Sequence, residues 1–145
     1  MYFVSVTRLR VRSVMYLPRF FRANEASIKS ITKVEGFIAG KELIDKGLTF
    51  WTVTLWESDQ AMKYFRNNDP HKSAMRNLPD WCNEAAYGHW IQDDALIPAW
   101  PQLYENFLAN LKITKVKHPS AKQEAKNYPA PRWTKLERPF KFAGK

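Results

Sequence analysis

The segment from Leu48 to Trp56, LTFWTVTLW, carries no charged residue on either face that it would present as a strand. Successive side chains of a strand point to opposite sides of the sheet. One face holds Phe50, Thr52, Thr54 and Trp56, and the other holds Thr49, Trp51, Val53 and Leu55. Both faces must be covered, since an uncovered one would leave a large apolar patch in water. A second copy of the sheet is the simplest cover, so the sequence predicts a homodimer packed sheet to sheet.

The rest of the chain predicts three further strands and the helices between them. Hydrophobic periodicity and capping residues give their bounds. The strands are expected over 2–12, 37–44 and 85–91, and the helices over about 18–33, from Ser58 to Phe65, and from Pro70 until Pro79 ends it. Gly47 is expected at positive φ in a hairpin turn. The order is β-α-β-β-α-β with a doubled second helix, which predicts an α+β, ferredoxin-like sandwich.

The charge of the chain divides it into two parts. Residues 1–111 are expected to form the ferredoxin-like domain with one appended helix, and residues 112–145 a basic, proline-containing extension. The net charge of +9 comes mainly from this C-terminal third. Aromatic residues alternate with lysine and arginine in the extension, which favours a strap across a partner subunit. Nucleic acid or an anionic membrane is the alternative partner for it.

Other features bound the location and the chemistry. Cys82 is the only cysteine, which indicates a reducing compartment, and we expect it to be buried. No apolar run approaches the ~20 residues that span a bilayer, so we expect a cytoplasmic protein without a transmembrane segment. The three histidines are far apart and no cysteine cluster exists, so we expect no metal site.

Arg8, Arg10 and Arg12 alternate along one face of the first strand. We expect a solvated strand end at which these arginines pair with Glu35, Glu42 or Asp45 across the sheet. An anion-binding stripe is the alternative.

A second stretch carries a resemblance to a known family. Trp56, Ser58, Ala61 and Met62 are followed by an aromatic residue, Phe65, and then by the run Pro70-His71-x-x-Ala74-Met75. This pattern resembles the dimeric α/β-barrel superfamily, in its antibiotic-biosynthesis-monooxygenase-like branch. Within that superfamily it looks closest to spheroidene-monooxygenase-like proteins and a related uncharacterised domain family. The resemblance covers roughly residues 2–110 and is specific for the fold more than for the chemistry.

The resemblance implies a monooxygenase-like protein that binds an apolar small molecule between its helices and its sheet. His71 shares a helical stripe with Ala74 and Met75, so it faces the sheet and is the candidate base or hydrogen-bond donor. Asn24, on the apolar stripe of the first helix, is the second candidate catalytic residue. The expected substrate-binding residues are Trp51, Trp56, Phe65, Met75 and Phe21.

Alternatives stay open at each of these residues. His71 could be a structural histidine tied to a backbone carbonyl, and Asn24 could reach solvent at the edge of its stripe. Alternation puts His89 and Trp90 on opposite faces without deciding which one faces the helices. The protein could equally be a non-enzymatic binding or scaffold dimer. No cofactor is required, but the superfamily includes haem proteins, and His71 or Met75 could serve as an axial ligand.

Overall fold

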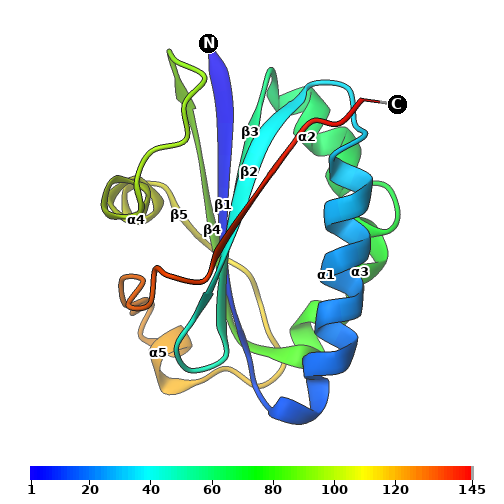
Figure 1. Cartoon of the computed structure of the whole chain (residues 1–145). Helices are drawn as coiled ribbons and strands as arrows, with labels where there is room; N and C mark the ends of the chain where they lie inside the picture. Colours follow the sequence, from blue (N-terminus) through cyan, green and yellow to red (C-terminus); the bar gives the residue numbers. More distant parts are fainter. Residues whose placement is uncertain (145) are drawn as a thin grey trace.

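Two layers of helices enclose a single antiparallel sheet in the computed structural model, which describes residues 1–144 (Figure 1). The first four strands are β1 (Tyr2–Val11), β2 (Phe37–Asp45), β3 (Thr49–Trp56) and β4 (Cys82–Gln92). Two short strands, β5 (Leu111–Ile113) and β6 (Glu137–Lys141), extend the sheet at its edges in the order β5-β4-β1-β3-β2-β6. The central order β4-β1-β3-β2 confirms the ferredoxin-like fold, and the sheet stays open within one chain.

Three helices cover one face of the sheet. They are α1 (Leu17–Ile31), which a short 3-10 turn η1 (Val14–Tyr16) precedes, α2 (Asp59–Arg66) and α3 (His71–Trp81). Ser58 caps α2 as expected, since its hydroxyl accepts a hydrogen bond from the Ala61 amide at 3.2 Å. Gly47 has the expected positive φ of +72° in the turn between β2 and β3. Pro79 does not end α3, which runs two residues further to Trp81, so that prediction is wrong.

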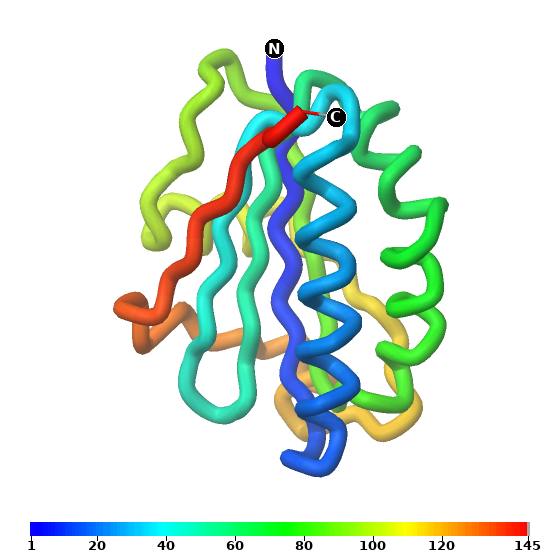
Figure 2. Tube along the Cα trace, turned by 45° about the vertical axis from the view of Figure 1, so that its right-hand side comes forward, coloured from blue at the N-terminus to red at the C-terminus, as the bar shows by residue number. Residues whose placement is uncertain are grey.

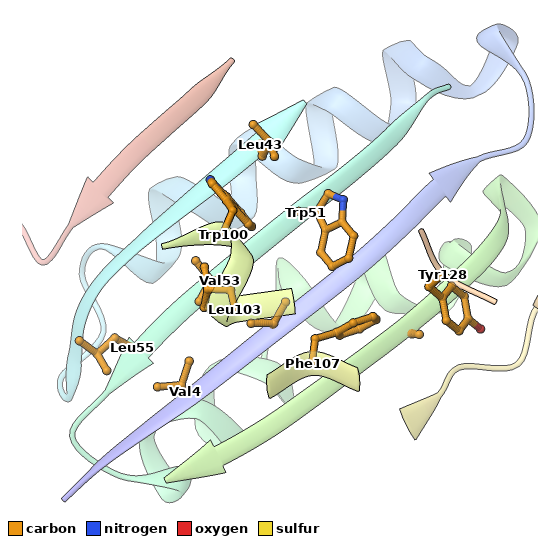
Figure 3. Close-up of a cluster of buried hydrophobic side chains, with 11 residues drawn as sticks. Val4, Leu43, Trp51, Val53, Leu55, Trp100, Leu103, Phe107 and Tyr128 are labelled. Carbon is orange, nitrogen blue, oxygen red and sulfur yellow. The ribbon is translucent and has the colours of Figure 1, made fainter. Parts of the chain in front are cut away.

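The opposite face of the sheet is covered by α4 (Trp100–Ala109) of the same chain. Figure 3 shows Leu103 and Phe107 of this helix above Val4, Val53 and Leu55 of the sheet. These five side chains are almost completely buried. Gly88 of β4 lets the helix come close, because a Cβ atom at that position would lie 3.2 Å from the Phe107 carbonyl oxygen.

We expected a second copy of the sheet to cover this face. That expectation is wrong, because α4 of the same chain already covers it. Trp51, Val53 and Leu55 need covering, as the sequence indicates, but the cover is intramolecular. The Trp51 ring, for example, packs against three aromatic rings of α4, those of Trp100, Tyr104 and Phe107, and the ring centroids are 5.1 to 6.4 Å apart. The homodimer itself stays a prediction, without the interface that motivated it.

The C-terminal extension folds back on its own domain. It forms β5, then the short helix α5 (Ala121–Glu124), and then β6, which pairs with β2 in antiparallel register. Figure 2 shows this last strand running along the edge of the sheet. The Asp45 carboxylate accepts hydrogen bonds from the backbone amides of Arg132 and Trp133, which fixes the approach to β6. We expected this extension to lie across a partner subunit. It instead adds an edge strand to the sheet of its own chain and is held there by hydrogen bonds to Asp45.

A buried polar cluster anchors this extension to β1 and β4. Arg8 and Glu84, which are 4% and 3% exposed, form an ion pair at 2.7 Å, so the expectation of a solvated arginine is wrong here. The Ser120 hydroxyl donates to the second oxygen of Glu84 at 2.8 Å. The Gln123 side chain makes two hydrogen bonds with the backbone of Ala85 in β4 and one with the carbonyl of Thr114, just after β5, and its oxygen also accepts from the Tyr128 hydroxyl at 2.7 Å. Buried charges need such partners, so the cluster specifies where residues 120–128 dock.

No helix within residues 1–144 combines the length and the apolar character that crossing a membrane requires.

Replacing Phe107 with alanine tests whether α4 covers the sheet. Loss of a fully buried aromatic side chain should lower the free energy of unfolding by about 3–5 kcal/mol, measured by urea denaturation. Leu108→Ala is the matched control, because the neighbouring Leu108 is 43% exposed; its effect should stay below about 1 kcal/mol. Equal effects of the two substitutions would contradict the packing of α4 on the sheet.

Candidate functional site

A cavity of about 440 Å³ lies between the sheet and the helices α1, α2 and α3. Its volume is within the range of roughly 300–1,000 Å³ that is usual for small-molecule sites. The strands β1, β3 and β4 form its floor and the three helices its walls and roof. Apolar side chains contribute most of the walls, and they include Phe20, Ile28, Met62, Phe65, Leu78 and Trp81.

The floor of the cavity is polar, in contrast to the other face of the same strands. Two rows of side chains cross the sheet in register, and the first runs from His89 through Ser5 to Thr54. The second row runs from Tyr87 through Thr7 to Thr52. All six residues line the cavity and are partly exposed to it. The α4 face of these strands carries fully buried valine and leucine instead, so the hydroxyl groups occur where the sheet borders open space.

His71 lies in the first turn of α3 and lines the cavity, as the helical spacing predicts. Its Nδ1 atom is buried and has no hydrogen-bond partner among the described residues. Its ring packs against Phe65, with centroids 4.8 Å apart. Burial lowers the pKa of His71, a hydrogen bond with the Arg66 backbone raises it more weakly, and the charge of Arg66 lowers it further. The imidazole is therefore a neutral group at neutral pH, and the backbone contact agrees with the alternative of a structural histidine tied to a carbonyl.

His89 also faces the helices, so the structure decides the question that alternation left open. Its ring lies between Phe3 and Tyr87, with centroids 5.1 and 4.9 Å away. Burial lowers the pKa of His89, and the positive charges of Arg66, Lys112 and Lys63 lower it further. Two neutral histidines thus border one cavity, from a helix and from a strand.

Asn24 lines the cavity from α1 and is half-buried. Its side-chain nitrogen donates a hydrogen bond to a Glu42 carboxylate oxygen at 2.8 Å. Glu42 in turn forms an ion pair with Arg138 at 2.5 Å. A carboxamide nitrogen carries two hydrogens, so one N–H of Asn24 stays available to a ligand.

Five of the seven predicted site residues line the cavity. Besides His71 and Asn24, these are Trp56, Phe65 and Met75. Trp51 does not, because it points to the α4 face of the sheet. Phe21 is 39% exposed and borders a separate cavity of about 160 Å³ on the far side of Asn24. The prediction erred for Trp51 because it assigned both tryptophans of β3 to one site although they differ in parity.

Sequence reasoning missed the polar floor and Arg66. Ser5 and Thr7 alternate in phase on β1, and Thr52 and Thr54 do so on β3. Hydroxyl residues at alternate positions of two strands could have indicated a polar surface on one face of the sheet. Arg66 ends α2 and lines the cavity, but its direction could not be inferred from a helix terminus.

Three further predictions from the sequence concern Cys82, metal ligands and haem. Cys82 is completely buried, as expected, and burial raises its pKa to about 12, so its thiol is inert. Within residues 1–144, no three His, Cys, Asp or Glu side chains gather as metal ligands would. His71 and Met75, the candidate axial ligands for haem, both line the cavity, so haem binding stays a prediction.

Comparison with known proteins identifies the fold. No family model matches the chain, and no curated protein sequence matches it. Among solved structures, Rv0793 from Mycobacterium tuberculosis superposes with a TM-score of 0.59 and 11% identity over 65% of this chain and 97% of its own. SnoaB, a cofactor-independent oxygenase from Streptomyces nogalater, gives 0.54 and 14% over 67% and 98%. A protein from Bacteroides thetaiotaomicron, named among the antibiotic biosynthesis monooxygenases, gives 15% identity over 68% and 92%.

These likenesses confirm the fold of the resemblance stated from the sequence. The chain shares its fold with Rv0793, with SnoaB and with the Bacteroides protein. At identities this low the likeness concerns the fold alone. The matched share, about two thirds of the chain, is close to the share that β1 through β4 make up.

The two lowered histidine pKa values predict how stability depends on pH. The unfolded chain binds protons at His71 and His89 at higher pH than the folded chain does. Their contribution to stability is therefore complete above the ordinary histidine pKa of about 6.5 and is lost as the pH falls through the folded values. The free energy of unfolding, measured with urea from about pH 7.5 to about pH 5, should fall less steeply in the double variant His71→Gln/His89→Gln than in wild type.

The exposed His118 supplies the control, and His118→Gln should leave the slope unchanged. NMR titration of the imidazole C–H signals gives the two pKa values directly. A pKa at or above the ordinary value for His71 or His89 would contradict their burial in the cavity.

Proposed function

We propose that the chain is a monooxygenase-like enzyme that oxidises an apolar small molecule held in the 440 Å³ cavity. The observation that carries the proposal is the neutral imidazole of His71, which borders this cavity among apolar side chains. An imidazole that is uncharged at neutral pH can act as a base towards a guest in the cavity. The polar floor under apolar walls supports the same view.

His71 is the general base of the proposed reaction. In its neutral form the imidazole takes a proton from an activated C–H bond of the substrate. The resulting carbanion transfers one electron to O₂, and recombination of the two radicals gives a peroxide anion, which the imidazolium protonates. Loss of water then leaves a carbonyl, so that R₂CH₂ and O₂ give R₂C=O and H₂O. The substrate carbon is oxidised, O₂ is reduced, and no other reductant is consumed.

Asn24 and the hydroxyl row assist by holding the oxygen of the substrate. The remaining N–H of Asn24 and the hydroxyls of Ser5 and Thr52 can donate to an enolate as charge develops on it. The fold likeness to SnoaB, described as a cofactor-independent oxygenase, adds support by analogy. The apolar walls exclude water and so strengthen these hydrogen bonds.

The non-enzymatic alternative shares the cavity but not the chemistry. A binding protein needs no base, whereas the neutral imidazole of His71 can serve as one. A cytoplasmic location stays a prediction, supported by the single, buried thiol of Cys82.

Ligand binding can be tested with the neutral, apolar dye N-phenyl-1-naphthylamine, whose fluorescence rises in apolar surroundings. Ala74→Phe fills the cavity from α3 and should weaken dye binding about tenfold or more, because a phenyl ring takes the place of the guest. Ala109→Phe, at an exposed position of α4, is the control and should bind the dye as wild type does. Absence of dye binding by the wild type would refute the cavity as a ligand site.

Catalysis can be tested with anthrone, an apolar tricyclic ketone with an activated methylene group. We expect uptake of one O₂ per anthraquinone formed, and a loss of about 10²-fold or more in kcat for His71→Gln. His118→Gln should keep the wild-type rate. Dye binding retained by His71→Gln would separate a catalytic defect from a folding one. A Soret band in the purified protein, or a rate insensitive to His71→Gln, would contradict the cofactor-free mechanism.

A further inference from the structure

The charged groups around the cavity are of one sign. Arg66 lines the cavity, and its charge reaches both His71 and His89. Lys63 and Lys112 lie close enough to His89 to act on it as well. None of the lining residues within the described part of the chain is an aspartate or a glutamate.

Two carboxylates near this region are already paired. Glu42 contacts the lining residue Asn24, but it borders the smaller cavity and forms an ion pair with Arg138. Asp59 pairs with Lys63 at 3.2 Å. Arg66, by contrast, makes no ion pair with any residue of the range 1–144, and its Nε donates only a long hydrogen bond of 3.5 Å to the side-chain oxygen of Asn67 at the surface. A partly buried arginine without a counter-charge beside an apolar cavity can bind an anion.

The imidazole and guanidinium groups gather at one end of the cavity, among the apolar side chains of Trp56 and Phe65. His71 begins α3 and His89 lies near the end of β4, so both mark the end of the cavity at which α2 brings in Arg66. At the other end of the strands Leu9 and Phe50 face one another in register, and Phe20 packs on Phe50 with ring centroids 4.7 Å apart. A ligand that spans the cavity along the strands thus meets a cation at one end and aliphatic and aromatic side chains at the other.

We propose that the guest is an apolar molecule with a single carboxylate group, which Arg66 and His89 bind while the apolar body extends towards Leu9 and Phe20. This inference rests on the proposed function, because it names the class of molecule that the same cavity accepts. The fork of one guanidinium matches a carboxylate in geometry. One unpaired arginine also matches one negative charge, whereas a doubly charged phosphate would be left half-compensated in an apolar site.

Three probes with the same ten-carbon chain test the inference: decanoate, 1-decanol and decyltrimethylammonium. Each is titrated against bound N-phenyl-1-naphthylamine on the full-length protein. Decanoate should compete about tenfold more tightly than decanol, since a charge-assisted hydrogen bond is added. The cation should compete worst. Raising the NaCl concentration should weaken decanoate binding and leave decanol binding unchanged.

Arg66→Gln is the decisive variant. It should weaken decanoate about tenfold and leave decanol within about twofold, because only the charge contact is lost. Arg19→Gln is the matched control, since Arg19 is exposed on α1 and does not line the cavity. It should change neither affinity.

The outcomes separate this inference from the proposed function. Decanol binding as tightly as decanoate, or decanoate binding that Arg66→Gln leaves intact, would overturn the carboxylate while keeping the cavity as an apolar site. Failure of the dye and of all three probes would instead refute the ligand cavity itself.

Discussion

The ion pair between Arg8 and Glu84 is the contact on which the distinctive part of this structure depends. Two charges buried this deeply would be costly if either lacked its partner. Ser120 shares Glu84, and the Arg8 guanidinium lies over the Tyr128 ring, 5.3 Å from its centroid. The pair therefore connects the central strand, its neighbour β4 and the returning extension. With the extension docked, α4 and Tyr128 close one face of the sheet and leave the cavity on the other.

The two faces of β1 and β3 show how one sheet can carry a packed core on one side and border an open cavity on the other. On the α4 face, valine and leucine side chains interdigitate with Leu103 and Phe107 and leave no space. On the helix face, smaller hydroxyl side chains stand under α1 and α3, and the helices do not reach down to them. Two further buried clusters, one around Phe20 and Leu78 and one around Trp56 and Phe65, hold the helices to this face, and the open volume lies beside them.

The sequence predicted the ferredoxin-like order because periodicity and capping are local signals. Ser58 and Gly47 act where their chemistry requires. It also predicted that both faces of β3 need covering, and His71 in the cavity followed from its place on the helical stripe. It could not predict what covers the second face. A helix of the same chain or a second copy of the sheet would bury Trp51 equally well. Only long-range contacts, such as those that Glu84 and Gln123 make with the extension and with β4, decide between the two covers. Arg66 was missed for a related reason, since the direction of a long side chain depends on tertiary contacts.

The last strand has a consequence for how the molecule is made. Phe140 of β6 stacks on Phe37 and lies against Gly40, where a Cβ atom would be 2.5 Å from its ring, and it also borders the cavity. During synthesis this wall emerges from the ribosome long after the histidines that it helps to enclose. The nascent domain therefore passes through a stage in which the floor of the cavity and both histidines have been made but the wall at Phe140 has not.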